Sequence, residues 1–328
     1  MDDEFSHVSY NKKILKITFA YNERGKMKFA VFTDLHYDSI HDGDRRIREF
    51  ISSVKKENVD FAIELGDLCY PTDKNRHIII KLKELGIPCF FSVGNHNSDA
   101  YPIDVVLKFL GIENSYYSFI FGNIKFIVID ANYIKTQDGS KPYYKRNYNK
   151  TTDAYPYVPQ EEIEWLKNEM VDDQFYYVIF SHQSLSNDFM KRGIFNREEV
   201  REILEQRNST GRKLLFCMNG HDHGDNVKVI NGIHYYTLNS MSYIWHGIKE
   251  TFNYSNEIHK KYPYLKDLIL YEEPLHVIVT IDNNMNVQID GMEGHYQTVT
   301  PKDIGMGSIW NGVSIEPRTS SLYIGRRT

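Results

Sequence analysis

Short apolar runs recur along the chain and are rich in Val, Ile, Phe and Tyr. This length and composition favour buried strands over buried helices. The predicted strands are Met27–Thr33, Val59–Leu65, Pro88–Val93, Lys125–Ile129, Tyr176–Ser181, Lys213–Met218 and Ile233–Leu238. Between them lie segments with helical spacing: Asp44–Glu57, Asp73–Leu85, Gln160–Met170 and Asn196–Gln206. The alternation of strand and helix predicts an α/β protein with layered sheets.

Polar residues and glycines at the ends of these segments mark the expected boundaries. Gly86 is expected to close the second helix, and three polar residues are expected as helix N-caps: Asp44, Asp73 and Asn196. Near the C-terminus, two apolar runs flank the turn sequence Asp-Asn-Asn, which predicts a hairpin of Leu275–Ile281 with Val287–Ile289.

Two segments lack this rhythm of strand and helix. Residues 132–159 form a long polar stretch rich in tyrosine, and loops of this length are usually functional or mobile. From about residue 293 the sequence has no strong period, so we expect it to cross the domain surface or reach a partner. No linker divides the chain, and we therefore predict a single domain, 1–328, with a C-terminal hairpin and tail at 271–328.

Composition narrows the possible partners. The 328 residues carry a formal net charge of -5, so the bulk basic field that gathers nucleic acid is missing. No apolar stretch is long enough to span a bilayer, and the acidic, polar start does not resemble a secretory signal. With three cysteines, an odd number, the expected location is cytoplasmic. The oligomeric state stays open.

Residues of the types that can bind metals follow the predicted strands closely. They are Asp34, His36, Asp67, Asn95, His96, His182, His221 and His223. In α/β proteins, ligands bind beyond the carboxyl ends of strands, where several loops meet. Five separate runs that each deliver Asp, His or Asn at this end indicate one shared site.

The spacing within these motifs favours a metal centre. In an extended exit from a strand, residues i and i+2 point the same way, so Asp34 with His36 and His221 with His223 would each face one cavity. A central carboxylate can bridge two cations, which suits Asp67. Nitrogen and oxygen donors without thiolate favour Mn, Fe, Zn or Co over Ca.

Taken in order, the motifs resemble the signature of the calcineurin-like metallophosphoesterases over about residues 28–240. The matching positions are Asp34-x-His36, Gly66-Asp67, Gly94-Asn95-His96, His182 and Gly220-His221-x-His223. Among the subgroups, the class III cyclic nucleotide phosphodiesterase-like phosphohydrolases are the nearest likeness. His36 stands at the Asp-x-His position of that subgroup, and no tyrosine ligand of the purple acid phosphatase kind is present.

This resemblance implies a four-layer α/β/β/α sandwich with two mixed β-sheets. It also implies two divalent or trivalent metal ions, Mn, Fe or Zn. One would be bound by Asp34, His36, Asp67 and His223, and the other by Asp67, Asn95, His182 and His221. A metal-bridging hydroxide would then hydrolyse a phosphomonoester or phosphodiester.

The resemblance also places His96 beside the metals as general acid for the leaving oxygen. The family's usual acidic residues near this histidine are absent, since Asn97 and Tyr70 occupy their positions. Asp99 or Asp73 is the expected substitute.

Alternative functions remain on the same core. A nuclease would need a basic path for the strand, which the net charge of -5 does not favour. A non-catalytic scaffold would have lost ligand positions, and none of the seven is lost. The expected substrate is therefore a small phosphate ester, with Arg192 and Arg197 as candidates to bind its phosphate.

Overall fold

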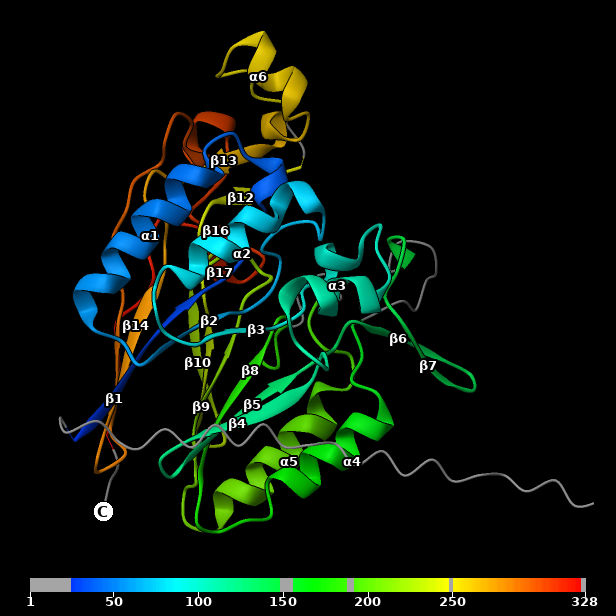
Figure 1. Cartoon of the computed structure of the whole chain (residues 1–328), viewed down its shortest axis with the longest axis vertical. Coiled ribbons are helices and arrows are strands. Elements are labelled where there is room, and N and C mark those ends of the chain that lie inside the picture. Colours follow the sequence, from blue (N-terminus) through cyan, green and yellow to red (C-terminus); the bar gives the residue numbers. More distant parts are fainter. Residues whose placement is uncertain (1–24, 148–155, 188–191, 248–249, 326–328) are drawn as a thin grey trace, which may run out of the picture.

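Two mixed sheets of six strands each lie face to face at the centre of the computed structural model (Figure 1). The structure describes residues 25–147, 156–187, 192–247 and 250–325.

The first sheet joins the two ends of the described chain in the order β18-β15-β14-β1-β2-β3. Strands β1, β2 and β3 are parallel, whereas β14 pairs antiparallel with β1, β15 with β14, and β18 with β15. The strands are β1 (Lys26–Phe32), β2 (Phe61–Glu64), β3 (Cys89–Phe91), β14 (Val277–Asp282), β15 (Val287–Asp290) and β18 (Leu322–Ile324). The C-terminal strands therefore complete a sheet that the N-terminal strands begin.

The second sheet is built from the middle of the chain, in the order β10-β11-β9-β8-β5-β4. Its four central strands, β11, β9, β8 and β5, are parallel, and the two edge strands pair antiparallel. The strands are β4 (Tyr117–Phe121), β5 (Ile124–Ile129), β8 (Tyr176–Ser181), β9 (Leu214–Asn219), β10 (Asn226–Ile230) and β11 (Ile233–Thr237).

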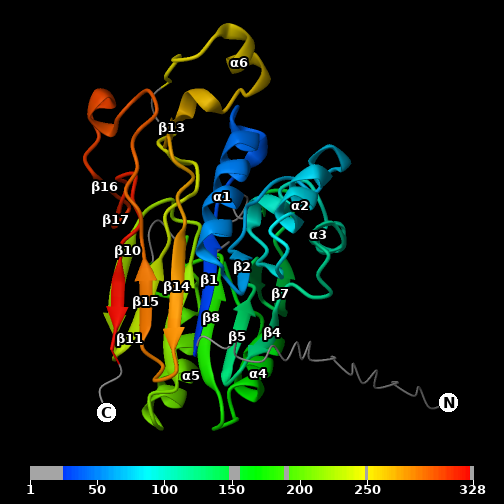
Figure 2. The same cartoon turned by 60° about the vertical axis from the view of Figure 1, so that its left-hand side comes forward.

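Helices cover the outer face of each sheet (Figures 1 and 2). Apolar residues of α1 (Gly43–Glu57), α2 (Arg76–Lys83) and α3 (Ile103–Leu110) share one core with the first sheet. Residues of α4 (Gln160–Glu169) and α5 (Arg197–Ser209) share another with the second sheet. The expected α/β/β/α sandwich is thereby confirmed.

Aromatic rings fill much of the space between the two sheets. Phe29 and Phe61 of the first sheet stack with centroids 4.6 Å apart, and Phe90 stacks on Phe119 of the second sheet at 3.7 Å. Phe126 meets Phe29 edge to face at 5.5 Å. This contact fixes the spacing of the sheets, and with it the spacing of the loops that leave their carboxyl ends.

A buried arginine anchors α1 to the C-terminal half of the chain. Arg46 is fully buried, and its Nε donates to Asp42 Oδ1 at 2.9 Å. Its other nitrogens donate to the carbonyl oxygens of Met241 and Tyr271. The carboxylate and the two carbonyl oxygens satisfy the hydrogen-bond donors of a guanidinium that would otherwise be costly to bury.

Several short elements lie outside the two six-stranded sheets. Each forms part of a local hairpin or excursion: β6 (Tyr133–Thr136) with β7 (Gly139–Pro142), β12 (Tyr243–Trp245) with β13 (Leu268–Leu270), β16 (Ile309–Trp310) with β17 (Val313–Ser314), and α6 (Asn256–Lys261). Helix α6 stands out from the sandwich at the top of Figures 1 and 2.

All seven predicted strands and the C-terminal hairpin are present, with boundaries that differ by at most two residues. Two helix starts were wrong. Asp42, not Asp44, holds the N-cap position of α1, and Asp73 begins a separate 3-10 turn, Asp73–Asn75, ahead of α2. Asn196 does precede α5, although its side chain does not cap the helix.

The two irregular segments contain more structure than the sequence indicated. The part of 132–159 that is described includes the β6–β7 hairpin, while 148–155 lies outside the described residues. The tail contributes β18 to the edge of the first sheet. The first 24 residues, which carried the prediction about a leader, also lie outside the described part. Within that part, no helix combines the length and apolarity needed to cross a membrane.

Candidate metal centre

Loops from both sheets meet at the carboxyl ends of β1, β2, β3, β8 and β9. They bring together the candidate ligands, which are buried or nearly so and form two adjoining groups. Asp34, His36 and His223 form the first group, and Asp67, His182 and His221 form the second, with the donor atoms of each group within 4.8 Å of one another.

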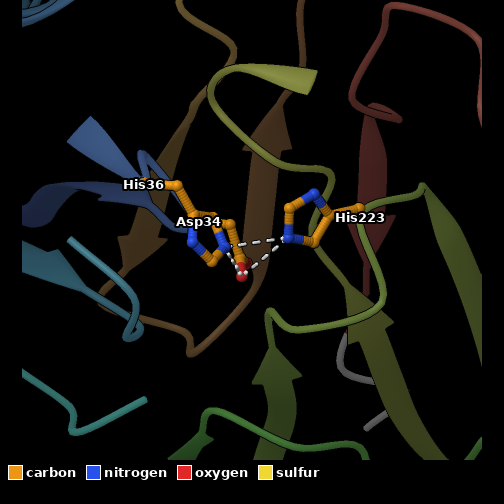
Figure 3. A group of neighbouring side chains, drawn as sticks. All are labelled: Asp34, His36 and His223. Atoms are coloured by element: carbon orange, nitrogen blue, oxygen red, sulfur yellow. Dashed lines mark hydrogen bonds and ion pairs between the residues drawn. The ribbon is translucent and has the colours of Figure 1, made fainter. Parts of the chain in front are cut away.

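In the first group, two imidazoles face one carboxylate (Figure 3). Asp34 Oδ1 lies 3.3 Å from His223 Nε2 and 3.5 Å from His36 Nε2, and the two ring nitrogens are 3.0 Å apart. Ligands bound to one ion at about 2.0–2.2 Å have separations of this size.

The second group has the same composition. His182 Nε2 lies 3.0 Å from Asp67 Oδ2 and 3.2 Å from His221 Nδ1. The same Asp67 oxygen is 3.6 Å from His36 Nε2 in the first group. This carboxylate therefore stands between the two groups, where a bridging ligand would be.

Three buried oxygens indicate where cations fit. Asp34 Oδ1, Asp67 Oδ2 and Asn95 Oδ1 accept no well-formed hydrogen bond from any described residue. Buried polar atoms without partners are costly, and oxygen donors that converge with neutral imidazoles form a suitable set for a transition-metal ion. The residues present thus fit a two-metal centre.

The backbone that presents these side chains is not the extended exit expected from the sequence. Five of the seven candidate ligands have positive φ angles between 46° and 68°: Asp34, His36, Asp67, His221 and His223. The i and i+2 argument was therefore wrong, although the residues do converge. Non-glycine residues in this region cost free energy and concentrate at functional sites.

Hydrogen bonds hold this strained backbone in place. Asp34 N donates to Gly66 O at 3.0 Å, and His36 N donates to Asp67 O at 2.9 Å, which ties the loop after β1 to the loop after β2. His221 N donates to Asp34 Oδ2 at 2.9 Å, which ties the second sheet to the first.

Two of the candidate ligand histidines are oriented by main-chain carbonyls. The Nδ1 atom of His182 lies 2.8 Å from Leu65 O, and Nδ1 of His223 lies 2.8 Å from Tyr243 O. Because a carbonyl only accepts, Nδ1 must carry the proton, which leaves Nε2 free to bind a metal. Such outer partners are typical of metal-binding histidines.

Glycine permits the loops to approach each other closely. A Cβ on Gly94 would lie 2.6 Å from Asp67 Cγ, well inside ordinary contact distance. Gly66 has a φ of +106°, a conformation that side-chain-bearing residues rarely adopt. Both positions therefore need glycine for the carboxylate of Asp67 to reach its place.

The charges of the centre suit cation binding. Burial would raise the pKa of Asp34, but His223, His36 and His182 hold this pKa well below its usual value. Burial lowers the pKa of His221 well below its usual value, and nearby His182 lowers it further, so His221 is neutral, as a ligand must be. His182 differs, since Asp67 outweighs burial and raises its pKa to about 10.

His96 lies beside the centre, with its ring next to that of His36. Its main-chain N donates to Asp67 Oδ1 at 2.8 Å, and its ring centroid is 5.1 Å from that of His36. Its side chain is 40% exposed, so a bound substrate could reach it. Nδ1 lies 2.8 Å from Asp99 Oδ2, which makes Asp99, and not Asp73, the carboxylate hydrogen-bonded to this histidine.

Asn97 has a structural role that sequence reasoning missed. Its Oδ1 accepts from Gly94 N at 2.8 Å and from Asp67 N at 3.3 Å, and its Nδ2 donates to Cys69 O at 3.0 Å. The family's acidic residue could not make the last bond. Asn97 therefore joins two ligand loops in place of orienting His96.

The two candidate phosphate-binding arginines differ in placement. Arg192 is close enough to Asp222 and His221 to affect the pKa of both. Arg197 Nη1 donates to Ile194 O at 3.1 Å, within its own loop. Arg192 is the better placed of the two.

Sequence comparison agrees with this geometry. A sequence model of the calcineurin-like phosphoesterases matches residues 27–225. The chain therefore belongs to the calcineurin-like phosphoesterase family and is a metal-dependent phosphoesterase. No curated protein sequence matches it.

Solved structures show the same fold at low sequence identity. A dimetal phosphatase from Danio rerio is 14% identical with a TM-score of 0.58, over 84% of this chain and 99% of that one. GAP50, the anchor in the inner membrane complex of Plasmodium, is 14% identical with a TM-score of 0.52, over 84% and 90%. Purple acid phosphatase PPD1 from yellow lupin is 14% identical with a TM-score of 0.50, over 90% and 54%.

Proposed function

We propose that the chain hydrolyses a small phosphomonoester or phosphodiester at a two-metal centre, with a cyclic nucleotide among the candidate substrates. The observation that supports this most directly is the pair of three-residue groups that meet at Asp67. Manganese, iron and zinc match the donor set. Three free cysteines favour a reducing compartment, and we propose the cytoplasm.

In this proposal, Asp34, His36 and His223 hold one ion, His182, His221 and Asn95 hold the other, and Asp67 bridges them. Asn95 is included because its buried Oδ1 lacks a hydrogen-bond partner among the described residues. Two ions there would acidify the attacking water and neutralise charge on the phosphoryl group.

His96 supplies the proton for the leaving oxygen. Nδ1 of His96 donates to the carboxylate of Asp99, so Nε2 is the ring nitrogen left to face a substrate. As the bond from phosphorus to the leaving oxygen breaks, the Nε2 proton of the imidazolium passes to that oxygen. The ring is left neutral, with its proton on Nδ1, and takes a new proton from solvent.

An anchoring protein shares this fold, so the fold alone does not decide between catalysis and scaffolding. What supports catalysis is the site, where all seven donors persist and His96 stands beside them with an exposed ring. A scaffold has no need of buried oxygens without partners or of strained ligand loops.

The test is a panel of metals and esters. The purified chain, stripped of metal and then supplied with Mn, Zn, Fe or Mg, is assayed on p-nitrophenyl phosphate, bis-p-nitrophenyl phosphate and cyclic AMP. We expect metal-dependent turnover of at least one ester with Mn, Fe or Zn. Inactivity with every metal, together with elemental analysis that finds no bound metal, would overturn the proposal.

The role of His96 has its own test. His96→Ala should lower kcat for an alkyl phosphate by roughly 10²–10⁴-fold, the usual contribution of a general acid. The fall should be much smaller for p-nitrophenyl phosphate, whose leaving group needs no proton. If turnover of the alkyl ester were unchanged, the assignment of His96 would be wrong.

A further inference from the structure

The carboxylate that orients His96 is itself held from a distant part of the chain. Asp99 is 2% exposed at its side chain, and its two oxygens receive three donors. His96 Nδ1 lies 2.8 Å from Oδ2, Arg146 Nε donates to Oδ2 at 3.2 Å, and Tyr143 OH donates to Oδ1 at 2.5 Å.

Tyr143 and Arg146 belong to the segment that follows the β6–β7 hairpin. The segment is pinned at its start, since Tyr143 N donates to Asn132 O at 2.7 Å. Tyr143 is buried, whereas the side chain of Arg146 is 49% exposed. The guanidinium of Arg146 also lies near the hydroxyl groups of Tyr264 and Tyr70 and interacts with both.

These contacts determine whether the carboxyl group of Asp99 is ionised. A buried carboxylate without partners would take up a proton. Burial alone raises the pKa of Asp99, but the bonds from His96, Tyr143 and Arg146 lower it below its usual value. An ionised Asp99 can only accept, and this fixes the proton of His96 on Nδ1 and the direction of its ring.

We propose that Tyr143 and Arg146 are positioning residues for protonation of the leaving group, which act by holding Asp99 against His96. Asp99 takes over the task for which neither Asn97 nor Tyr70 offers a carboxylate, and Tyr143 and Arg146 hold Asp99 in place. The inference rests on the proposed function of the centre. It gives Tyr143 and Arg146, which follow the β6–β7 hairpin, a supporting role in catalysis through Asp99.

The test compares leaving groups in the full-length chain loaded with Mn. The variants are Tyr143→Phe and Arg146→Met, with Tyr144→Phe and Lys145→Met as neighbouring controls. The measured quantity is the ratio of kcat for an alkyl phosphate to kcat for p-nitrophenyl phosphate. We expect this ratio to fall roughly tenfold in each variant, the loss typical of one hydrogen bond to a charged group. KM and both controls should stay unchanged, and Arg146→Lys should restore part of the ratio.

Equal losses on both esters would indicate a purely structural role and would overturn the proposal, as would an unchanged ratio. A second readout does not depend on turnover. A second sample, zinc-loaded protein labelled with ¹⁵N-histidine, is measured at a pH where the ring of His96 is neutral. In the wild type the ring proton should lie on Nδ1, and in Tyr143→Phe/Arg146→Met it should be shared between Nδ1 and Nε2. If the wild type hydrolysed no ester, the proposed function would fail, and the nitrogen spectrum alone would support or overturn the positioning role.

Discussion

A single methyl group at Gly94 should dismantle the metal centre. The backbone of Gly94 has φ -95° and ψ 162°, which alanine adopts readily, so Gly94→Ala introduces no backbone strain. Its Cβ, however, would lie 2.6 Å from Asp67 Cγ, whereas ordinary contact begins at 3.4 Å. The carboxylate or the loop must therefore move by at least about 0.8 Å, the difference between these distances.

That displacement exceeds what metal coordination tolerates, since bond lengths vary by only about ±0.2 Å. Because Asp67 contacts both ligand groups, we expect both sites to weaken by roughly 10–100-fold or more, the range seen when support for metal ligands is removed. The overpacked loop should also cost about 1–3 kcal/mol of unfolding free energy.

The assay is titration calorimetry of the metal-free protein with zinc or manganese, combined with elemental analysis after dialysis. Gly307→Ala is the matched control, because Gly307 is exposed and a Cβ there meets nothing within 4 Å. Wild type and the control should bind two ions per chain, and Gly94→Ala fewer. If Gly94→Ala bound two ions with the affinity of the wild type, the placement of Asp67 between the groups would be refuted.

Three further predictions concern stability. Arg46→Leu should lower the unfolding free energy by about 3–5 kcal/mol in urea titrations, because it strands Asp42 and two buried carbonyls, while Arg48→Leu on the exposed face of the same helix should change little. Burial raises the pKa of Asp42, but Arg46 and Arg45 bring it below its usual value. Its stabilisation is therefore present above about pH 4 and lost as the pH falls through the lower folded pKa, so Asp42→Asn should flatten the stability profile between about pH 5 and pH 2. Removal of metal with a chelator should lower Tm, and metal at a hundredfold excess over Kd should restore about 2.7 kcal/mol per site; a Tm that ignores metal would contradict this linkage.

The candidate ligands could be predicted from the sequence because each of them follows a buried strand. Runs such as Tyr176–Ser181 are apolar on both faces, which predicts a central strand, and His182 stands at its carboxyl end. Edge elements were harder to predict. Strand β10 (Asn226–Ile230) is half-exposed and mixes polar with apolar residues, so it has no alternation strong enough to recognise. Helix α3 (Ile103–Leu110) was also missed, and it is only eight residues long.

The surroundings of His96 could not be predicted for a different reason. Its partner Asp99 is three residues away, but Tyr143 and Arg146 come from 44 and 47 residues beyond Asp99. Such contacts depend on where the polar segment that contains Tyr143 and Arg146 lies in the folded chain, and no local sequence pattern predicts that position. The left-handed backbone at Asp34 and His36 is likewise set by bonds to the neighbouring loop, not by residue type.

The most direct test of the account is anomalous diffraction from crystals of the chain grown with manganese. The account predicts two peaks per chain about 3.5–4 Å apart, with Asp67 in contact with both. One peak should contact Asp34, His36 and His223, and the other His182, His221 and Asn95. A single peak at saturating manganese, or two peaks that do not share Asp67, would contradict it.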